Sequence, residues 1–233
     1  MIIIVTGATK GLGAAIVHKM AANLSKVTFL LNARNETELQ KMKTDVEAAY
    51  QHTVHIFPAD LSIKNAVLAY GEWCLQFGTP DILVNNAGSF IPGNVYDEAD
   101  EALEKMLAVN LLSAYHLTRK LLPAMMMAKH GHIFNICSIA SLQAYEGGGA
   151  YSISKYALAG FTDNLRKEMM PHNIKVTGVY PGAAFTDSWS GSGVDTKRIM
   201  EANDIAEMVY AATKLSPQAC VESIILRPQL GDL

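Results

Sequence analysis

The chain contains 233 residues, of which 50% are hydrophobic and 18% are charged, and its formal net charge is −3 at pH 7. A disordered chain would combine low hydrophobicity with high net charge, so that class is excluded. The charge balance leaves no basic footprint for nucleic acid or for an anionic membrane surface, and the length suits one large domain better than two small ones.

Apolar runs and helical repeats alternate along the chain. Residues 1–5 form a continuous apolar run, typical of a strand buried on both faces, and residues 11–24 carry apolar positions at helical spacing. This βαβ series predicts an α/β fold: a doubly wound, seven-stranded parallel sheet of the Rossmann type, forming a single domain over residues 1–233. The further strands are predicted at 27–31, 53–57, 82–84, 132–138, 174–180 and 222–226, and the further helices at 35–50, 62–77, 100–129, 150–170 and 203–215.

Several side chains carry the signals that begin or break helices. Asn35 and Ser62 are predicted as N-caps, and either Asn203 or Asp204 is predicted to cap the last helix. Pro123 is expected to kink or end the long helix in which it falls.

The least regular stretch is residues 183–200, which is rich in Gly, Ser and Thr. It follows the carboxyl end of a predicted strand, where ligands sit in open α/β sheets. We therefore expect it to form a lid over a substrate.

A glycine-rich turn, Thr6–Gly13, joins the first strand to the first helix. Its glycines permit a tight turn and close approach of the backbone to a pyrophosphate, while the helix N-terminus supplies free N–H groups and a positive dipole. In this position the turn predicts dinucleotide binding.

The end of the second strand indicates which dinucleotide is bound. An NAD site usually has an acidic residue there, but this chain has Ala33 followed by Arg34. Arg34 and Lys10 suit a 2′-phosphate, which favours NADP(H); the alternative is that both are solvated surface cations. Asp60 ends the third strand, where it is placed either to bind the adenine amino group or to cap the next helix.

Tyr151 and Lys155 are four residues apart on a predicted helix, so their side chains share one face. An ammonium group beside a phenol stabilises the phenolate, which lets such a tyrosine exchange a proton near neutral pH. The alternative is an ordinary pair on a helix surface. Ser138 ends a predicted strand, where its hydroxyl either points into a cleft or serves as a cap.

Together these residues resemble the classical short-chain dehydrogenase/reductase family over nearly the whole chain. The family motifs that the sequence carries are TGxxxGxG at 6–13, NNAG at 85–88, a helix Asn at Asn110, a Ser at Ser138, YxxxK at Tyr151 and Lys155, and PG-xxx-T at Pro181, Gly182 and Thr186. The resemblance implies an NADP(H)-dependent oxidoreductase that interconverts a carbonyl and an alcohol.

The resemblance also implies roles for four residues. Tyr151 would be the general acid or base, and Ser138 would hydrogen-bond the substrate oxygen. Lys155 would hold the nicotinamide ribose, and Asn110 would hold a water that links Lys155 to solvent. The residues expected to contact the cofactor are Gly7, Thr9, Lys10, Gly11, Leu12, Gly13, Arg34, Asp60, Leu61, Asn86, Ala87, Gly88, Tyr151, Lys155, Pro181, Gly182 and Thr186.

Two segments, 181–189 and 225–233, are similar to bacterial sepiapterin reductase-like members of the family. This similarity implies that Trp189 stacks on a flat heterocycle such as a pterin; the alternative is that it closes the lid over any apolar substrate. Tyr145 lies in the loop before Tyr151 and is a second candidate for contact with the substrate.

Two other functions remain open at this point. One is a catalytically idle NADP(H)-binding sensor or scaffold, although a sensor has no need of the proton-relay residues. The other is a nucleotide-sugar epimerase or dehydratase, which usually carries a longer substrate domain.

Several partners and locations are expected from composition or resemblance. His130 and His132 lack a third ligand at suitable spacing, so no metal site is expected. The three cysteines form no CxxC pair, and no apolar stretch approaches the ~18 residues of a membrane span, so we expect a cytoplasmic protein. Resemblance implies a homodimer or homotetramer built on the helices at 100–129 and 150–170.

Overall fold

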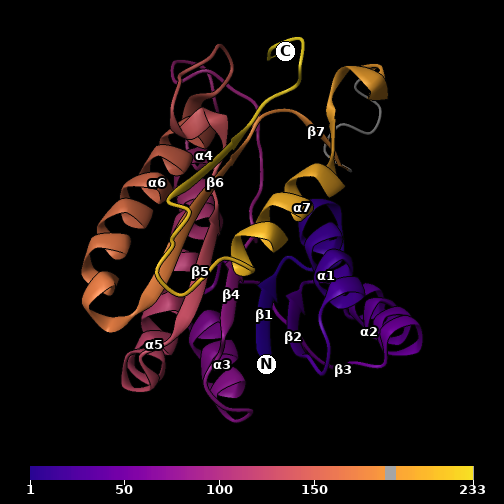
Figure 1. Ribbon diagram of the computed structural model, residues 1–233. Coiled ribbons are helices and arrows are strands. Elements are labelled where there is room, and N and C mark those ends of the chain that lie inside the picture. Colours follow the sequence, from indigo (N-terminus) through magenta and orange to yellow (C-terminus); the bar gives the residue numbers. More distant parts are fainter. Residues whose placement is uncertain (187–192, 233) are drawn as a thin grey trace.

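The computed structural model describes residues 1–186 and 193–232. Seven parallel strands form one sheet in the order β3-β2-β1-β4-β5-β6-β9 (Figure 1). Its strands are β1 (Ile2–Thr6), β2 (Thr28–Ala33), β3 (Thr53–Pro58), β4 (Ile82–Asn85), β5 (Gly131–Ile136), β6 (Ile174–Pro181) and β9 (Ser223–Leu226). The helices are α1 (Gly11–Asn23), α2 (Glu36–Tyr50), α3 (Lys64–Leu75), α4 (Ala102–Leu107), α5 (Ser113–Ala128), α6 (Gly149–Met169) and α7 (Ala202–Thr213).

The sheet is buried on both faces, which confirms the predicted doubly wound α/β fold. On β1, Ile3, Ile4 and Val5 are all fully buried, as a two-sided strand requires. The chain order reverses between β1 and β4, which are hydrogen-bonded neighbours. In open α/β sheets this reversal opens a crevice at the carboxyl ends of the strands, where ligands bind.

Helices cover the sheet in two layers (Figure 1). On one face α1 packs against α7, and Ile16, Met20 and Val209 share a core with Phe29 of β2. On the other face α3 packs against α5, and Tyr70 lies in the core cluster there. None of the helices in the described part of the chain combines the length and the apolar composition that crossing a bilayer requires.

The prediction of one long helix at 100–129 is wrong in detail. This stretch is divided into α4, a five-residue π-helical segment (Ala108–Leu112) and α5. Pro123 neither ends nor divides it and stays inside α5. The buried Leu121 and Met125 explain why, since packing on the core outweighs the hydrogen bond that a proline removes.

Two of the predicted helix starts need correction. Asn35 caps α2 as predicted, through a 3.1 Å hydrogen bond from the backbone N–H of Glu38 to its Oδ1. Ser62 does not cap α3, whose N-cap is Ile63. The backbone N–H of Ser62 donates instead to Oδ1 of Asp60, so Ser62 belongs to the turn before the helix.

The last helix also begins differently from the prediction. Its N-cap is Glu201, whose backbone N–H donates to the Asp204 carboxylate at 3.0 Å in a capping box. The predicted lid at 183–200 is bounded by a short parallel pair, β7 (Ala184–Phe185) and β8 (Met200–Glu201). Residues 187–192, including Trp189, lie outside the described residues, so the lid stays a prediction.

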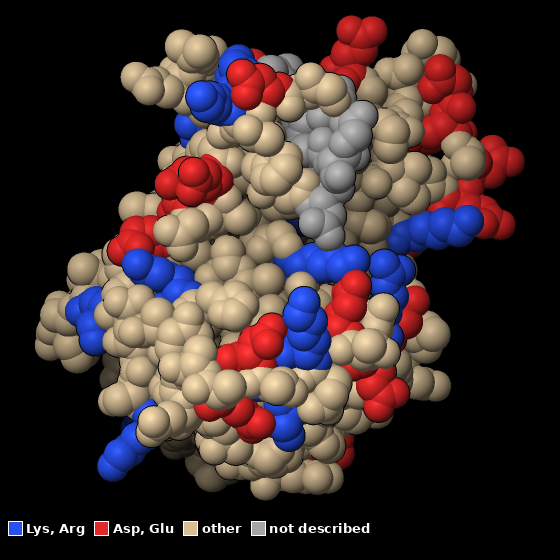
Figure 2. Space-filling model, turned by 90° about the vertical axis from the view of Figure 1, so that its right-hand side faces the viewer, with Lys and Arg blue, Asp and Glu red and all other residues tan. Residues whose placement is uncertain are grey.

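Figure 2 views the molecule from the side that carries α1, α2 and α7 in Figure 1. Acidic and basic side chains are interspersed on this face, with no broad field of one sign. This distribution agrees with the small net charge of −3.

Candidate active site

A cleft of about 1110 Å³ lies at the carboxyl ends of the central strands. Typical ligand pockets have volumes of roughly 300–1,000 Å³, so this cleft has room for a large cofactor. The predicted site residues that line it are Gly7, Thr9, Lys10, Gly11, Leu12, Arg34, Asp60, Leu61, Asn86, Ala87, Gly88, Ser138, Tyr151, Lys155, Pro181, Gly182 and Thr186. Three predicted residues among those described, Gly13, Asn110 and Tyr145, are not part of its lining.

Glycines shape the turn between β1 and α1. Gly7 and Gly11 have φ values of 62° and 52°, in the left-handed region that favours glycine. A Cβ atom on Gly13 would lie 2.2 Å from the carbonyl oxygen of Gly7 and 2.5 Å from Nδ2 of Asn86. Gly13 therefore lies under the turn and permits its close packing, rather than forming the cleft wall.

The first turn of α1 faces the cleft through Gly11 and Leu12. Its N-cap residue, Lys10, makes no side-chain capping hydrogen bond, and the turn carries no acidic residue. The first N–H groups of a helix have no partner inside the helix, and the helix dipole favours an anion beside them. This geometry fits the diphosphate of a dinucleotide.

Charged residues gather at the ends of β2 and β3. Nζ of Lys10 lies 2.9 Å from Oε1 of Glu38, and Arg34 lines the cleft nearby. The pKa of Asp60 is lowered mainly by the backbone N–H of Ser62, with a smaller contribution from Arg34. Asp60 does not cap α3, whose N-cap is Ile63, so the predicted capping role is wrong and its carboxylate holds the turn before the helix instead. The predicted contact with adenine stays a prediction.

The NNAG segment joins the glycine turn to β4. Nδ2 of Asn86 donates to the carbonyl oxygens of Thr6 and Gly7 at 2.9 and 3.0 Å. The hydroxyl oxygen of Thr6 accepts the backbone N–H groups of Asn86 and Ala87, both at 2.9 Å. The role of Thr6 in this junction could not be predicted, because its partners lie about 80 residues away.

Tyr151, Lys155 and Ser138 meet at the other end of the cleft. Lys155 is buried, and its Nζ donates to the carbonyl oxygen of Ile136 at 2.8 Å while lying 5.9 Å from the centre of the Tyr151 ring. Ser138 was predicted to end the strand, but β5 ends at Ile136 and Ser138 follows it. Ser138 caps a short helical turn, in which its Oγ accepts the N–H of Ala140 at 3.1 Å. The two roles predicted for Ser138, cap and cleft residue, thus coincide.

Asn110 lies behind the cleft in the π-helical segment. Its Oδ1 accepts the N–H of Ser89 at 2.8 Å, and its Nδ2 donates to the Ser89 carbonyl at 3.0 Å and to the Ser154 hydroxyl at 2.9 Å. Ser154 in turn donates to the carbonyl oxygen of Tyr151 at 2.7 Å. The side chain of Asn110 is therefore held by the elements on either side of it, and Ser89 and Ser154 are supporting residues that no motif indicated.

The ring of Phe90 packs against Tyr151. Phe90 lines the cleft and packs edge-on against Tyr151, with ring centres 4.9 Å apart. Tyr145 is half-exposed outside the cleft lining, and partial burial together with Tyr151 raises its pKa to about 12. Its predicted contact with substrate is not visible here, and Trp189 lies outside the described residues.

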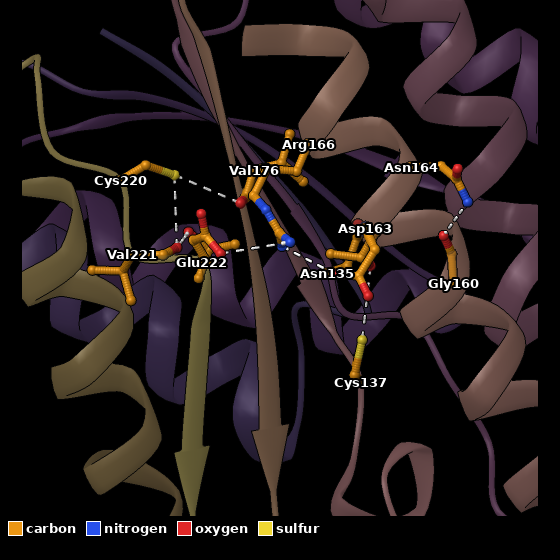
Figure 3. Close-up of polar contacts among 12 residues, drawn as sticks. Asn135, Cys137, Gly160, Asp163, Asn164, Arg166, Val176, Cys220, Val221 and Glu222 are labelled. Atoms are coloured by element: carbon orange, nitrogen blue, oxygen red, sulfur yellow. Dashed lines mark hydrogen bonds and ion pairs between the residues drawn. The ribbon is translucent and has the colours of Figure 1, made fainter.

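Cys137 precedes Ser138 and is also among the residues that line the cleft, but its thiol lies beside α6. Figure 3 shows it at the end of β5, beside α6, and its Sγ lies 3.9 Å from Oγ1 of Thr162. Burial raises the pKa of the thiol to about 11, so the reactive thiolate is scarce near neutral pH.

A model of the short chain dehydrogenase family matches residues 1–196. A sepiapterin reductase of Chlorobaculum tepidum is 31% identical to this chain over 239 aligned positions, which cover 100% of this chain and 98% of that protein.

Two solved structures share the fold. A metagenomic short-chain oxidoreductase in complex with NADP is 31% identical, with a TM-score of 0.84 and coverage of 98% of this chain and 97% of the other. An alcohol dehydrogenase from the archaeon Thermococcus sibiricus, complexed with 5-hydroxy-NADP, is 25% identical, with a TM-score of 0.89 and coverage of 98% and 96%.

Proposed function

The chain belongs to the short-chain dehydrogenase family, and from this premise we propose that it is an NADPH-dependent oxidoreductase that reduces a carbonyl group to an alcohol. The observation that carries the proposal is the single cleft that holds Tyr151, Lys155 and Ser138 at one end and the glycine turn at the other. Such a cleft has room for the proposed proton donor and the proposed dinucleotide site within one ligand-sized space.

NADP(H) is the proposed cofactor. The first turn of α1 and the glycines before it would receive the diphosphate, and Arg34 with Lys10 would bind the 2′-phosphate. The NADP complexes among the similar solved structures support this choice. When bound, the nicotinamide supplies the hydride.

The proposed roles of the catalytic residues follow from their hydrogen bonds. Oγ of Ser138 accepts the N–H of Ala140, which leaves the hydroxyl proton to be donated to the substrate oxygen. Tyr151 protonates that oxygen as negative charge develops on it. An ammonium group has three donors, and Lys155 uses one on Ile136, so others remain for the nicotinamide ribose and for the phenol.

Asn110 is proposed to support the proton relay rather than to meet the substrate. Its amide is fixed by Ser89 and Ser154, and a water held beside it would connect Lys155 with solvent. Its place outside the cleft lining is consistent with this indirect role.

A pterin-like carbonyl is the proposed substrate. The similarity to a sepiapterin reductase and the exposed ring of Phe90 against Tyr151 both favour a flat substrate that can pack on an aromatic ring. Trp189 is proposed to stack on the same substrate, with an unspecified aldehyde or ketone as the alternative.

A homodimer or homotetramer is proposed through the exposed faces of the π-helical segment and α6. Leu112, Ile153 and Tyr156 are 42%, 43% and 46% exposed, and large exposed apolar side chains on long helices commonly mark an interface. Light scattering at several protein concentrations tests this, and a monomer at all of them would contradict it.

The decisive experiment measures NADPH oxidation by the purified protein against a panel of carbonyls that includes sepiapterin, small diketones and simple aldehydes. Tyr151→Phe should lower kcat about 100-fold or more while the Kd for NADPH changes less than threefold, since only the proton donor is lost. Tyr50→Phe, a change at the C-terminal end of α2, is the matched control.

Each competing function has its own outcome. NADPH binding without turnover of any carbonyl would favour the idle sensor. Conversion of a nucleotide-sugar without net consumption of NADPH would favour the epimerase. Unchanged turnover in Tyr151→Phe would overturn the catalytic assignment.

A further inference from the structure

Residues 89–98, between β4 and α4, contact two of the proposed catalytic residues. At the start of this segment, Ser89 exchanges two hydrogen bonds with the side chain of Asn110, at 2.8 and 3.0 Å. The next residue, Phe90, packs its ring against that of Tyr151. The segment is therefore attached to the catalytic end of the cleft over its first two residues.

The other end of the segment closes the N-terminus of α6. Oε2 of Glu98 accepts the backbone N–H of Ala150 at 2.9 Å. The N-cap residue of α6 is Gly148, which has no side chain with which to cap the helix. A carboxylate at this point satisfies an N–H that has no helical partner and lies at the positive end of the helix dipole. Glu98 thus supplies the missing cap from a different element.

The glycines at 147–149 lie against this segment, and Gly149 is the one that the close contact requires. The N–H of Gly147 donates to Oδ1 of Asn94 at 3.0 Å, and its carbonyl oxygen accepts the N–H of Gly93 at 3.1 Å. Gly149 has a φ of 26°, and a Cβ atom there would lie 2.5 Å from both Oε2 of Glu98 and the carbonyl oxygen of Gly93. No side chain fits at position 149 between the segment and α6, so the contact depends on this glycine.

The opposite half of α6 is fixed separately. Arg166 lies 3.0 Å from Asp163 and 3.6 Å from Glu222, and so joins α6 to the start of β9 (Figure 3). The first turn, which carries Tyr151, receives Glu98 at its N-terminus, and the hydroxyl of Ser152 also ties it to the carbonyl oxygen of Ala140 at 2.8 Å. A change at Glu98 should therefore move this turn without releasing the rest of the helix.

We propose that Glu98 is a positioning residue for the reduction. It caps α6 through the N–H of Ala150, the residue before Tyr151, and in this way holds the phenol of Tyr151 beside Ser138. This inference rests on the proposed function, because it concerns the placement of the proton donor. It assigns Glu98 no contact with substrate or cofactor.

Three variants test the proposal in the full-length protein. Glu98→Ala should lower kcat about tenfold, because a small misplacement of a catalytic group is costly, while the Kd for NADPH changes less than twofold. Glu98→Gln should stay within about threefold of the wild-type kcat, because the amide oxygen accepts the same N–H. Asp100→Ala removes an exposed carboxylate two residues later and should behave as wild type.

Hydrogen exchange provides a readout that does not depend on turnover. The amide of Ala150 should exchange faster in Glu98→Ala and remain protected in Glu98→Gln. A wild-type kcat in Glu98→Ala, or equal losses of kcat in the Ala and Gln variants, would overturn the inference. A parallel loss of NADPH affinity would also overturn it, since that marks general damage to the fold. If the wild-type protein itself reduces no carbonyl, the proposed function fails instead, and exchange at Ala150 still decides whether Glu98 caps α6.

Discussion

Helices α1 and α6 both have residues of their first turns in the same cleft, but within the described residues only α6 has a carboxylate of the protein at its N-terminus. The first turn of α1 carries no acidic residue, and its N-cap side chain makes no capping hydrogen bond. The N-cap of α6 is also without a side-chain cap, but the carboxylate of Glu98 fills that N-terminus from outside.

A helix N-terminus can therefore serve either to bind an external anion or to fix the side chains of its own first turn. A helix N-terminus whose first turn keeps acidic side chains away attracts an external anion. An N-terminus whose free N–H groups are already bonded to a carboxylate of the protein instead holds the side chains of its first turn in fixed positions. Glycine is needed at both, since Gly13 lets the turn pack on α1 and Gly149 lets the segment at 89–98 pack on α6.

Breaking the α1 side should have the largest effect. In Gly13→Ala the new Cβ would meet the Gly7 carbonyl oxygen at 2.2 Å, so the turn must move away from α1. We expect NADPH affinity to fall about 100-fold and stability to fall by about 1–3 kcal/mol. Calorimetric titration and thermal unfolding measure the two effects.

The matched control for Gly13→Ala is Gly160→Ala. Gly160 is an exposed glycine inside α6 with no atoms within 4 Å of its Cβ position. This change should leave NADPH affinity unchanged, and it is compared on that measurement alone because Gly160 shares a face of α6 with Ile153 and Tyr156, where an interface is proposed. Unaltered NADPH affinity in Gly13→Ala itself would mean that the glycine turn is not the binding element.

Removing the Arg34 guanidinium near the α1 turn tests whether this end of the cleft binds the 2′-phosphate. Arg34→Ala should lower the preference for NADPH over NADH about 10- to 100-fold, because a charge-assisted hydrogen bond to the 2′-phosphate is lost. The Kd values for both cofactors measure it, with Lys41→Ala on the exposed face of α2 as control. A preference that survives in Arg34→Ala would show that this guanidinium does not read the phosphate.

Breaking the α6 side should separate turnover from binding. Gly149→Ala places a Cβ 2.5 Å from the Gly93 carbonyl oxygen and should lower kcat about tenfold through the first turn of α6. NADPH affinity should stay within twofold of wild type, which is the reverse of the result expected for Gly13→Ala. If both variants lose cofactor binding alike, the two helix N-termini do not have distinct tasks.

A buried histidine, His132, should make the folded protein less stable at acid pH, and this loss affects the whole fold rather than one helix N-terminus. Nε2 of His132 lies 2.7 Å from Oγ1 of Thr177, and burial, with a smaller effect of Lys175, lowers its pKa to about 3. Below pH 6.5 the unfolded chain takes up a proton that the folded protein does not, so stability falls as pH falls. The free energy of unfolding should drop by about 1 kcal/mol between pH 6.5 and 5.5.

Denaturant titrations at the two pH values measure this effect. His132→Gln, which cannot be protonated, should lose this part of the pH dependence. Equal pH dependence in the two proteins would contradict the assignment.

Local patterns predicted most of the fold because the sheet is buried on both faces. Each strand reads as an apolar run, and each intervening helix has its own spacing. The errors occur where packing outweighs local preference. Pro123 stays inside α5, and the π-helical segment at 108–112 interrupts a stretch that reads as one regular helix.

The candidate site divides in the same way. Motif positions placed the glycine turn, Tyr151 and Lys155 on one cleft, although their roles stay predictions. Supporting residues such as Ser89 carry no motif and were not found. They act through partners distant in sequence, and no local rule selects those partners.

Sequence order and composition therefore determined a parallel sheet, a glycine turn at the first helix and a Tyr–Lys pair on one helix face. Each of these depends on neighbours within a few residues or on a simple repeat. Tertiary structure alone decided that Glu98 meets the N–H of Ala150, 52 residues further along the chain. A hydrogen bond of this kind exists only once the layers are packed, because packing brings that carboxylate to the start of α6.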